Sequence, residues 1–342
     1  MAGVTQRSAM PRVSILLPVK NEEQFLPLAL ASMFRQTLAD WELIAVDDGS
    51  TDATAAILVE AAARDSRVRV VPFQGHGLVA ALNAGLAACR SPLVARMDGD
   101  DISHPLRLEA QEAFLRNNPE IGLVACRFRH FPRQSLRVGM LSYETWQNSL
   151  GDHEMVVRDI FVESPFVHPS VMFRKSEVVR VGGYREMGWA EDYDLWHRLA
   201  AAGTRFARLP QTLFFWRDRP GRATRTLEEY STENFRACKL HYLQQEFLRG
   251  TRDVILAGAG LEGRRWRPIL SGAGIAVSRW VDVDPRKIGR TLHGAPVLSA
   301  DEIVAGDGKM LITVGTRGAR EGIREWALKA GFKEGTDFIC VT

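Results

Sequence analysis

The stretch VARMDGDD, residues 94–101, runs from a short apolar segment directly into three carboxylates. Asp98, Asp100 and Asp101 stand almost side by side, and Gly99 separates the first two. Clustered carboxylates raise one another's pKa unless a cation or hydrogen-bond donors compensate for their charge. Their oxygen atoms are the ligands that Mg²⁺ and Mn²⁺ prefer. The stretch therefore indicates a metal site at the end of a strand or, taken alone, a solvated acidic turn, and the neighbouring sequence has to decide between them.

Three further strands precede this stretch, and each is an apolar run of the kind that is buried in a parallel sheet. They are VSILLPV, ELIAVDD and VRVVPF, at residues 13–19, 42–48 and 68–73. A helix follows each strand. Asn21 is expected to cap the first helix, with Glu22 and Glu23 in its first turn, and Ser50 or Thr51 is expected to cap the second. Strand and helix alternate four times, which predicts a doubly wound α/β sheet.

Ligands of such sheets bind outside the carboxyl ends of the strands. The residues expected there are Pro18, Val19 and Asn21 after the first strand, Asp47 and Asp48 after the second, and Asp98, Asp100 and Asp101 after the fourth. One set of carboxylates can accept hydrogen bonds from a base or ribose, and another can hold a divalent ion against a diphosphate. The pattern predicts a nucleotide site at this edge.

These motifs resemble those of the family 2 glycosyltransferases, which have the GT-A fold. The matching segments are PVKNEE (18–23), VDDGSTD (46–52), GLVAALNAGL (77–86), ARMDGDD (95–101), HPSVMFR (168–174) and AEDYDLWHRL (190–199), within about residues 12–225. The resemblance implies an inverting transfer of a sugar from a nucleotide diphosphate donor. It also implies that Asp47 and Asp48 hold the base and ribose, that Asp98 contacts the ribose or the metal, and that Asp100 binds the metal, Mg²⁺ or Mn²⁺.

An inverting transfer needs a general base, because the acceptor hydroxyl must lose its proton as it attacks. Glu191 and Asp192 begin a predicted helix and point away from its apolar face. By resemblance to the family's ED motif, Asp192 is the expected base, and Glu191 orients it or contacts the acceptor. Without the upstream motifs, the two acids would be interpreted as a simple helix cap.

Several nearby residues leave two interpretations open. Arg96 either assists the phosphates or points outward from its strand, and Asp101 either joins the site or caps the next helix. His168 either contacts donor or acceptor or is satisfied at the edge of a strand over residues 168–174.

Residues 205–226, with three adjacent aromatic residues among six arginines, form either a strand with a basic loop or a surface for donor phosphates or anionic lipid. Many family members have a histidine where WRDRPG (216–221) stands, so a metal or phosphate role for this loop is left open.

A second strand-and-helix pattern begins after residue 250. Gly258, Gly260 and Gly263 form a G-x-G-x-x-G pattern after an apolar strand, and Asp282 follows about 20 residues later, as in a dinucleotide-binding fingerprint. The remaining chain has room for only one nucleotide-binding half. It is similar to the small Rossmann-like domain that precedes some sugar acyltransferases and binds a nucleotide sugar there. Their hexapeptide repeats are absent, so no acyl transfer is expected; a structural or dimerising role is the alternative to ligand binding.

The length of 342 residues allows two domains. The predicted organisation is a flexible tail (1–11), a glycosyltransferase domain (12–230), a linker helix (231–250) and a Rossmann-like domain (251–342). The net charge of +3 is small and the basic residues are dispersed, which argues against a nucleic-acid partner. The four cysteines lack metal spacing, and no apolar run reaches the ~18 residues of a membrane span. We expect a cytoplasmic protein, at most peripheral to the inner face of the membrane.

The leading hypothesis is a metal-dependent, inverting glycosyltransferase of the hexosyl type. Its expected donor is a UDP-sugar, and its expected acceptor is a glycan or a lipid-linked precursor in cell-surface glycan biosynthesis. One alternative is an NAD-type oxidoreductase that uses the GAGLEG segment, residues 258–263. Another is a non-catalytic sensor or scaffold that binds a nucleotide sugar.

Overall fold

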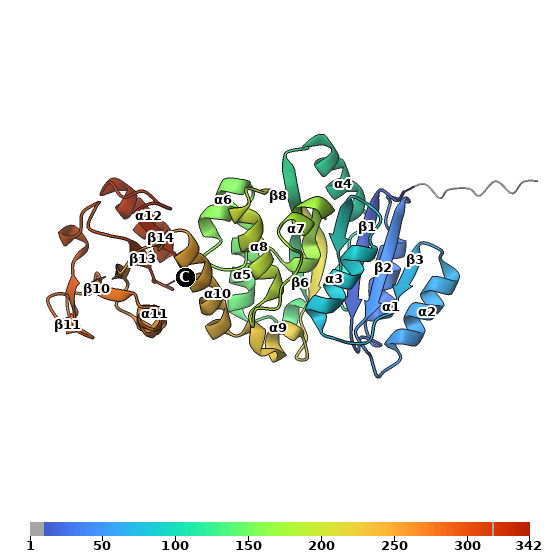
Figure 1. Cartoon of the computed structure of the whole chain (residues 1–342), viewed down its shortest axis with the longest axis horizontal. Helices are drawn as coiled ribbons and strands as arrows, with labels where there is room; N and C mark the ends of the chain where they lie inside the picture. The colour runs from blue at the N-terminus through green and yellow to red at the C-terminus, as the bar shows by residue number, and fades with distance from the viewer. Residues whose placement is uncertain (1–9, 317) are drawn as a thin grey trace, which may run out of the picture. The chain divides into compact units, whose positions relative to one another are not determined.

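The computed structural model describes residues 10–316 and 318–342 (Figure 1), so most of the predicted tail lies outside the described residues. The chain divides into two compact units. The first consists of Met1–Val156, Pro165–Met187 and Glu191–Thr226, and the second of Val157–Ser164, Gly188–Ala190 and Leu227–Thr342.

The first unit is built on a mixed sheet that has eight strands within the described residues, in the order β3-β2-β1-β4-β7-β6-β8-β5. The strands are β1 (Val13–Val19), β2 (Trp41–Asp47), β3 (Val68–Val71), β4 (Leu93–Arg96), β5 (Ile102–Ser103), β6 (Ile121–Phe131), β7 (Val171–Arg174) and β8 (Arg205–Arg217). The strands β1 to β4 pair with one another in parallel, whereas β7 is antiparallel to both β4 and β6. This arrangement confirms the predicted doubly wound α/β sheet, with β7 as an antiparallel strand inside it.

Helices cover both faces of this sheet. They are α1 (Leu26–Phe34), α2 (Thr54–Arg64), α3 (Leu78–Ala88), α4 (Arg107–Asn117), α5 (Val138–Ser149), α6 (His153–Asp159), α7 (Lys175–Arg180), α8 (Glu191–Ala201) and α9 (Ala223–Thr226). Ile15 and Leu17 of β1 belong to a core cluster that includes residues of α1, α2 and α4. On the other face, α3 approaches so closely at Gly85 that a Cβ there would collide with Leu16. The continuous burial of β1 follows from these two layers.

The strand predicted over residues 168–174 begins later than expected. His168–Ser170 forms the 3₁₀ helix η2, and β7 starts at Val171. Pro169 has no N–H to donate to a neighbouring strand, and the Ser170 hydroxyl donates to the carbonyl oxygen of Val167 at 2.7 Å. A local turn therefore replaces the first three residues of the strand.

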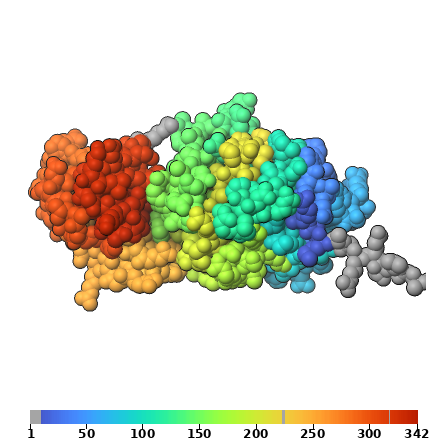
Figure 2. All heavy atoms as spheres, turned by 90° about the horizontal axis from the view of Figure 1, so that it is seen from above, coloured from blue at the N-terminus to red at the C-terminus, as the bar shows by residue number. Residues whose placement is uncertain are grey.

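The second unit contains a smaller sheet in the order β11-β12-β10-β9-β13-β14. Its elements are α10 (Thr232–Gln245), β9 (Asp253–Ala257), α11 (Leu261–Gly272), β10 (Ala276–Val281), β11 (Thr291–Leu292), β12 (Ala295–Leu298), β13 (Met310–Ile312), α12 (Ala319–Lys329) and β14 (Phe338–Cys340). Only β11 pairs antiparallel among these described strands. Figure 2 shows this unit, in orange and red, as a closely packed body.

The segment Val157–Ser164 is integrated into the second unit by buried polar contacts. Lys239 of α10 donates to the carbonyl oxygens of Val162, at 2.7 Å, and of Val341, at 3.2 Å. Arg324 of α12 pairs with the buried carboxylate of Asp159. Because a buried charge is stable only when it is paired or hydrogen-bonded, these contacts hold the segment firmly.

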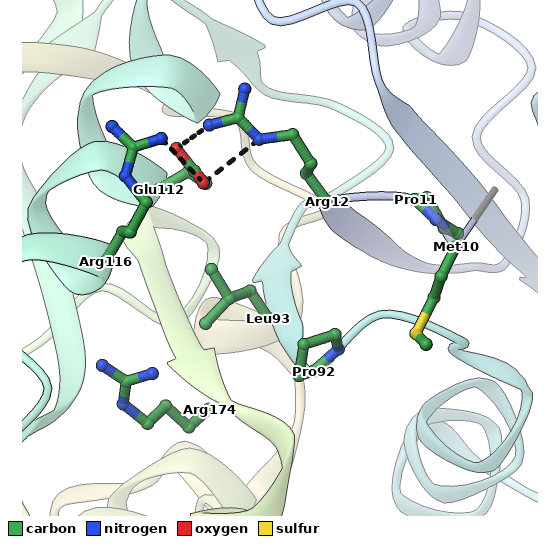
Figure 3. Close-up of a pocket in the computed structure, with 8 residues that line it drawn as sticks. All are labelled: Met10, Pro11, Arg12, Pro92, Leu93, Glu112, Arg116 and Arg174. Atoms are coloured by element: carbon green, nitrogen blue, oxygen red, sulfur yellow. Dashed lines mark hydrogen bonds and ion pairs between the residues drawn. The ribbon is translucent and has the colours of Figure 1, made fainter.

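A pocket of about 380 Å³ lies next to the amino ends of β1 and β4 (Figure 3). Arg12 pairs with Glu112 there, with nitrogen–oxygen distances of 3.2 and 2.5 Å. Since β1 and β4 are parallel, this pocket is at the end of the strands opposite to the predicted nucleotide site. It therefore contributes nothing to that site.

All four cysteines are buried and free. Among the described residues, none of the helices has the length and apolar character that crossing a bilayer requires.

Candidate functional site

The carboxyl ends of β1 and β2 are held together by hydrogen bonds at the predicted edge. The backbone N–H of Asp48 donates to the carbonyl oxygen of Val19 at 2.8 Å. The buried Asp48 carboxylate accepts a bond from the Gly77 N–H at 3.0 Å and lies 3.4 Å from the Lys20 ammonium. Pro18 and Val19 have buried side chains within β1, so they can offer a ligand only their backbone.

Asn21 does not cap a helix, contrary to the prediction. Its φ of 54° is left-handed, its side-chain oxygen accepts a bond from the Thr51 N–H at 2.8 Å, and its own N–H donates to the Ser50 hydroxyl at 2.9 Å. Ser50 in turn donates to Asp47 at 2.5 Å. These residues therefore join the loops after β1 and β2 to each other.

The predicted helix starts are both too early. The first helix, α1, begins only at Leu26, so Glu22 and Glu23 precede it instead of lying in its first turn. The second helix, α2, begins at Thr54 and has no side-chain cap.

Arg96 is buried instead of pointing outward from β4. Its guanidinium pairs with the half-buried Asp98 carboxylate at 2.6 Å. It also interacts electrostatically with Glu191 and Asp192 at the start of α8. Arg96 thus connects the predicted donor edge to the predicted catalytic acids.

Asp100 lies in an acidic cluster that sequence reasoning only partly found. Glu22, from the loop after β1, approaches it because Gly99 has no side chain: a Cβ on Gly99 would lie 2.9 Å from Val19 and 3.2 Å from Glu22. Burial and the Asp100 charge raise the pKa of Glu22 to about 7. Burial and Asp98 raise the pKa of Asp100 above its usual range. The PVKNEE motif contains Glu22, but its local pattern predicts a helix start and gives no indication of the contact with Asp100.

Arg219, from the loop after β8, neutralises part of this cluster. Its Nε donates to Asp100 at 2.7 Å, and a terminal nitrogen pairs with Glu22. The guanidinium carbon also lies 5.5 Å from the centre of the Phe25 ring. Asp100 and Arg219 are 119 positions apart, so no local pattern could have found this pair.

Asp101 does not cap the next helix. Its fully buried carboxylate accepts a hydrogen bond from the Arg217 N–H at 2.7 Å, and burial followed by the nearby Asp100 and Asp98 raises its pKa well above the usual range. The Arg217 side chain donates to the carbonyl oxygen of Asp100 at 2.6 Å. Asp101 therefore anchors the basic loop over the acidic turn.

Glu191 and Asp192 form the first turn of α8. The buried Glu191 carboxylate lies 3.4 Å from His168 Nδ1, and His168 Nε2 lies 2.9 Å from the hydroxyl of Tyr184. Asp192 accepts a bond from the Tyr193 N–H at 2.7 Å. Burial, and secondly the charge of Glu191, raise the pKa of Asp192 well above the usual range. The sequence did not indicate Tyr184, whose hydroxyl extends this polar chain.

The acidic cluster supplies only some of the ligands that a divalent ion needs, and a bound nucleotide would supply others. The described residues contain no group of three or more His, Cys, Asp or Glu side chains that could hold a metal ion. Mg²⁺ bound with a nucleotide commonly uses one or two carboxylates, with phosphate oxygens and waters completing its shell. Asp98 and Asp100 supply suitable oxygen atoms, and the raised pKa of Asp100 indicates that added positive charge is favourable there.

The glycine pattern of the second unit has two structural glycines and one without a packing role. A Cβ on Gly263 would collide with the carbonyl oxygen of Gly258 and lie 2.9 Å from Thr313, whereas a Cβ on Gly260 would meet nothing within 4 Å. The Asp282 carboxylate accepts bonds from the Ala259 N–H, at 2.9 Å, and Lys287, at 2.8 Å. Asp282 therefore already holds the glycine loop.

This difference predicts that alanine substitutions at Gly263 and Gly260 affect the stability of the second unit differently. Gly263→Ala is expected to destabilise the second unit by about 1–3 kcal/mol, because the added methyl group forces α11 away from the loop that follows β9. Gly260→Ala, the matched control, is expected to leave stability nearly unchanged. Calorimetric melting of the full chain measures both, and equal melting profiles for the two variants would contradict the packing role of Gly263.

The fold and this edge agree with the family to which the chain belongs. Residues 14–182 match the model of the family described as Glycosyl transferase family 2, and the chain is a member of this family and thus a glycosyltransferase. The amylovoran biosynthesis glycosyltransferase AmsE of Erwinia amylovora is 33% identical over 206 residues, which are 58% of this chain and 74% of that protein. The UDP-Gal:alpha-D-GlcNAc-diphosphoundecaprenol beta-1,3-galactosyltransferase of Escherichia coli is 31% identical over 206 residues, 59% of this chain and 73% of that protein.

A solved structure has a similar fold at low sequence identity. The crystal structure of S. aureus TarS 1-349 in complex with UDP-GlcNAc superposes with a TM-score of 0.56 and 17% identity, covering 76% of this chain and 71% of that chain. At this identity the likeness concerns the fold alone, and it confirms the predicted GT-A type.

Proposed function

We propose that the chain transfers a hexosyl group from a UDP-sugar to a hydroxyl acceptor, with inversion at the anomeric carbon and with the help of a divalent ion. The observation that carries the proposal is the position of Arg96. It pairs with Asp98 on the donor edge and interacts with Glu191 and Asp192 at the start of α8. A donor bound at this edge therefore has its reacting sugar near the carboxylates that can activate an acceptor.

The donor's nucleotide is held by the first two loops in this proposal. Asp47 and Asp48 accept hydrogen bonds from the base and the ribose, and Asn21 keeps their two loops in register. Asp98 and Asp100 face the diphosphate and would hold Mg²⁺ or Mn²⁺. When bound, such an ion supplies Lewis-acid stabilisation of the negative charge on the leaving diphosphate.

The acceptor's proton passes to Asp192. A general base must be unprotonated and must still attract a proton, and the raised pKa of Asp192 favours the second requirement. Glu191, placed by His168 and Tyr184, orients Asp192 and adds the negative charge that keeps its affinity for a proton high. Arg96 balances the remaining charge from the donor side.

The acceptor class is proposed from the relatives. Their names include amylovoran biosynthesis and transfer to a sugar on diphosphoundecaprenol. We propose a growing surface polysaccharide or its lipid-linked precursor as acceptor. A lipid-linked acceptor would bring the enzyme to the inner face of the membrane as a peripheral protein.

The test combines donor binding with donor hydrolysis. With UDP and Mn²⁺, the melting temperature of the chain is expected to rise, because a ligand that binds only the folded state stabilises it more as the ligand concentration rises above the dissociation constant. Slow hydrolysis of UDP-glucose, UDP-galactose or UDP-N-acetylglucosamine is expected without any acceptor. A chain that binds UDP but hydrolyses none of these would be a sensor or scaffold instead of a transferase of UDP-sugars.

A second nucleotide site in the second unit is supported by its strand order. The parallel strands β12-β10-β9-β13-β14 have the order of a Rossmann-type sheet, and Gly258, Gly260 and Gly263 follow its central strand. Gly260 leaves room for a phosphate, whereas Asp282 already accepts bonds from Ala259 and Lys287. We propose that this unit binds a nucleotide sugar. Fluorescence titration with NADH tests the oxidoreductase alternative, which tight NADH binding together with absent UDP binding would favour.

A further inference from the structure

The basic loop after β8 places a guanidinium where positive charge is most needed in the donor site. Arg219 contacts both Asp100, at 2.7 Å, and Glu22. All three side chains are at most about a quarter exposed. Charge-assisted contacts of partly buried groups are stronger than surface ion pairs, so Arg219 is a substantial partner for Asp100.

This loop is held in place by contacts that do not involve Arg219. The Arg217 N–H donates to Asp101, and the Arg217 side chain donates to the Asp100 carbonyl oxygen. The Arg217 guanidinium carbon lies 4.4 Å from the ring centres of Phe25 and Phe131. The position of the loop therefore does not depend on the ion pair between Arg219 and Asp100.

A divalent ion bound by Asp100 would meet Arg219 at the same carboxylate. Two cations within a few ångströms of each other repel strongly in a partly buried site. A guanidinium that is removed from a carboxylate can instead bind phosphate oxygens, which match its planar array of donors. Such oxygens enter this site with a nucleoside diphosphate.

We propose that Arg219 and a divalent ion are alternative partners of Asp100, and that Arg219 moves to the diphosphate when the ion and the nucleotide bind. The proposal rests on the donor site proposed above. In the free chain Arg219 keeps Asp100 and Glu22 neutralised, and in the loaded chain it becomes a ligand of the diphosphate. Removal of the Arg219 side chain should therefore increase the affinity for the metal ion and decrease the affinity for the nucleotide.

The experiment measures both affinities in the full chain. Titration with Mn²⁺ alone, followed by electron paramagnetic resonance, is expected to give about fivefold tighter binding for Arg219→Ala than for the wild type, because the competing charge is gone. Titration with UDP at saturating Mn²⁺ is expected to give about fivefold weaker binding. Arg219→Lys keeps the charge but loses the second donor nitrogen. Its affinities for Mn²⁺ and for UDP are expected to lie between those of the wild type and those of Arg219→Ala.

Arg225 provides the matched control. It belongs to α9, which directly follows this loop, and it pairs with Asp218 at 2.7 Å, so Arg225→Ala is expected to change neither affinity. Asp100→Asn is expected to weaken Mn²⁺ binding with or without Arg219. If Arg219→Ala binds Mn²⁺ no more tightly than the wild type while Asp100→Asn still loses it, the exchange is wrong and the metal site stands. If Asp100→Asn leaves Mn²⁺ binding unchanged, or no variant binds Mn²⁺ or UDP, the proposed donor site fails together with the exchange.

Discussion

Asp192→Asn is expected to lower the rate of donor hydrolysis by about 10²–10⁴-fold, the usual contribution of a general base. The amide oxygen can still accept the hydrogen bond from Tyr193, so the start of α8 is retained, but the amide cannot take a proton from the acceptor. Steady-state kinetics with a UDP-sugar and Mn²⁺ measure the loss. UDP affinity is the internal control and should stay unchanged. A rate close to that of the wild type would show that Asp192 is not the base.

The pH profile provides a second test of the same assignment. Because burial and Glu191 raise the pKa of Asp192, this carboxylate becomes protonated at a higher pH than an ordinary aspartate. Activity should therefore fall as the pH decreases through that raised pKa, and this acidic limb should be missing from the residual activity of Asp192→Asn. A limb that persists in the variant would belong to another group.

The same shift has a consequence for stability. A carboxyl group whose pKa is higher in the folded than in the unfolded chain destabilises the fold progressively as the pH rises from the unfolded pKa to the folded pKa, and by its full amount above the folded pKa. Asp192→Asn removes that charge, so the variant is expected to melt at a higher temperature than the wild type in alkaline buffer. A more stable but inactive variant would separate catalysis from folding.

Asp100→Ala is expected to lower metal-dependent donor hydrolysis by about a hundredfold or more, because stabilisation of the leaving diphosphate by a metal ion is worth several kcal/mol. The variant should need much more Mn²⁺ to reach its residual rate. Hydrolysis rates measured over a range of Mn²⁺ concentrations check both effects. An unchanged Mn²⁺ dependence would contradict the role of Asp100.

Asp101→Asn is the matched comparison within the same acidic turn. Asp101 is fully buried and accepts the Arg217 N–H, a bond that an asparagine oxygen can also accept. This variant should keep the Mn²⁺ dependence of the wild type. The two variants together separate the metal ligand from the residue that anchors the loop.

The rim of the sheet could be predicted because it follows from local rules. Strands such as β1 and β4 are continuous apolar runs, and the acids that follow them must lie at the same edge once the strands are parallel. The start of α8 also follows from a local rule, because Glu191 stands directly before residues whose spacing gives a helix with one apolar face.

The contacts made by these residues could not be predicted in the same way. Asn21 has the sequence appearance of a helix cap, but tertiary hydrogen bonds to Ser50 and Thr51 override that local preference. Asp101 accepts a hydrogen bond from Arg217, and Asp100 accepts one from Arg219. Both arginines lie more than a hundred positions later in the sequence. Such pairs depend on how β5 and β8 meet, which no periodicity encodes.

The second unit is assembled from three separate stretches of the chain, and this has a consequence for how it can be inherited and made. Val157–Ser164 lies within residues 14–182, the range that matches the family, yet it packs with residues that follow position 226. Asp159 leaves the ribosome 165 residues before its partner Arg324. An exchange of genes that moved only residues 227–342 would leave this segment behind. The second unit is therefore not a detachable module, and its recombination requires a recipient that already contains the matching segment.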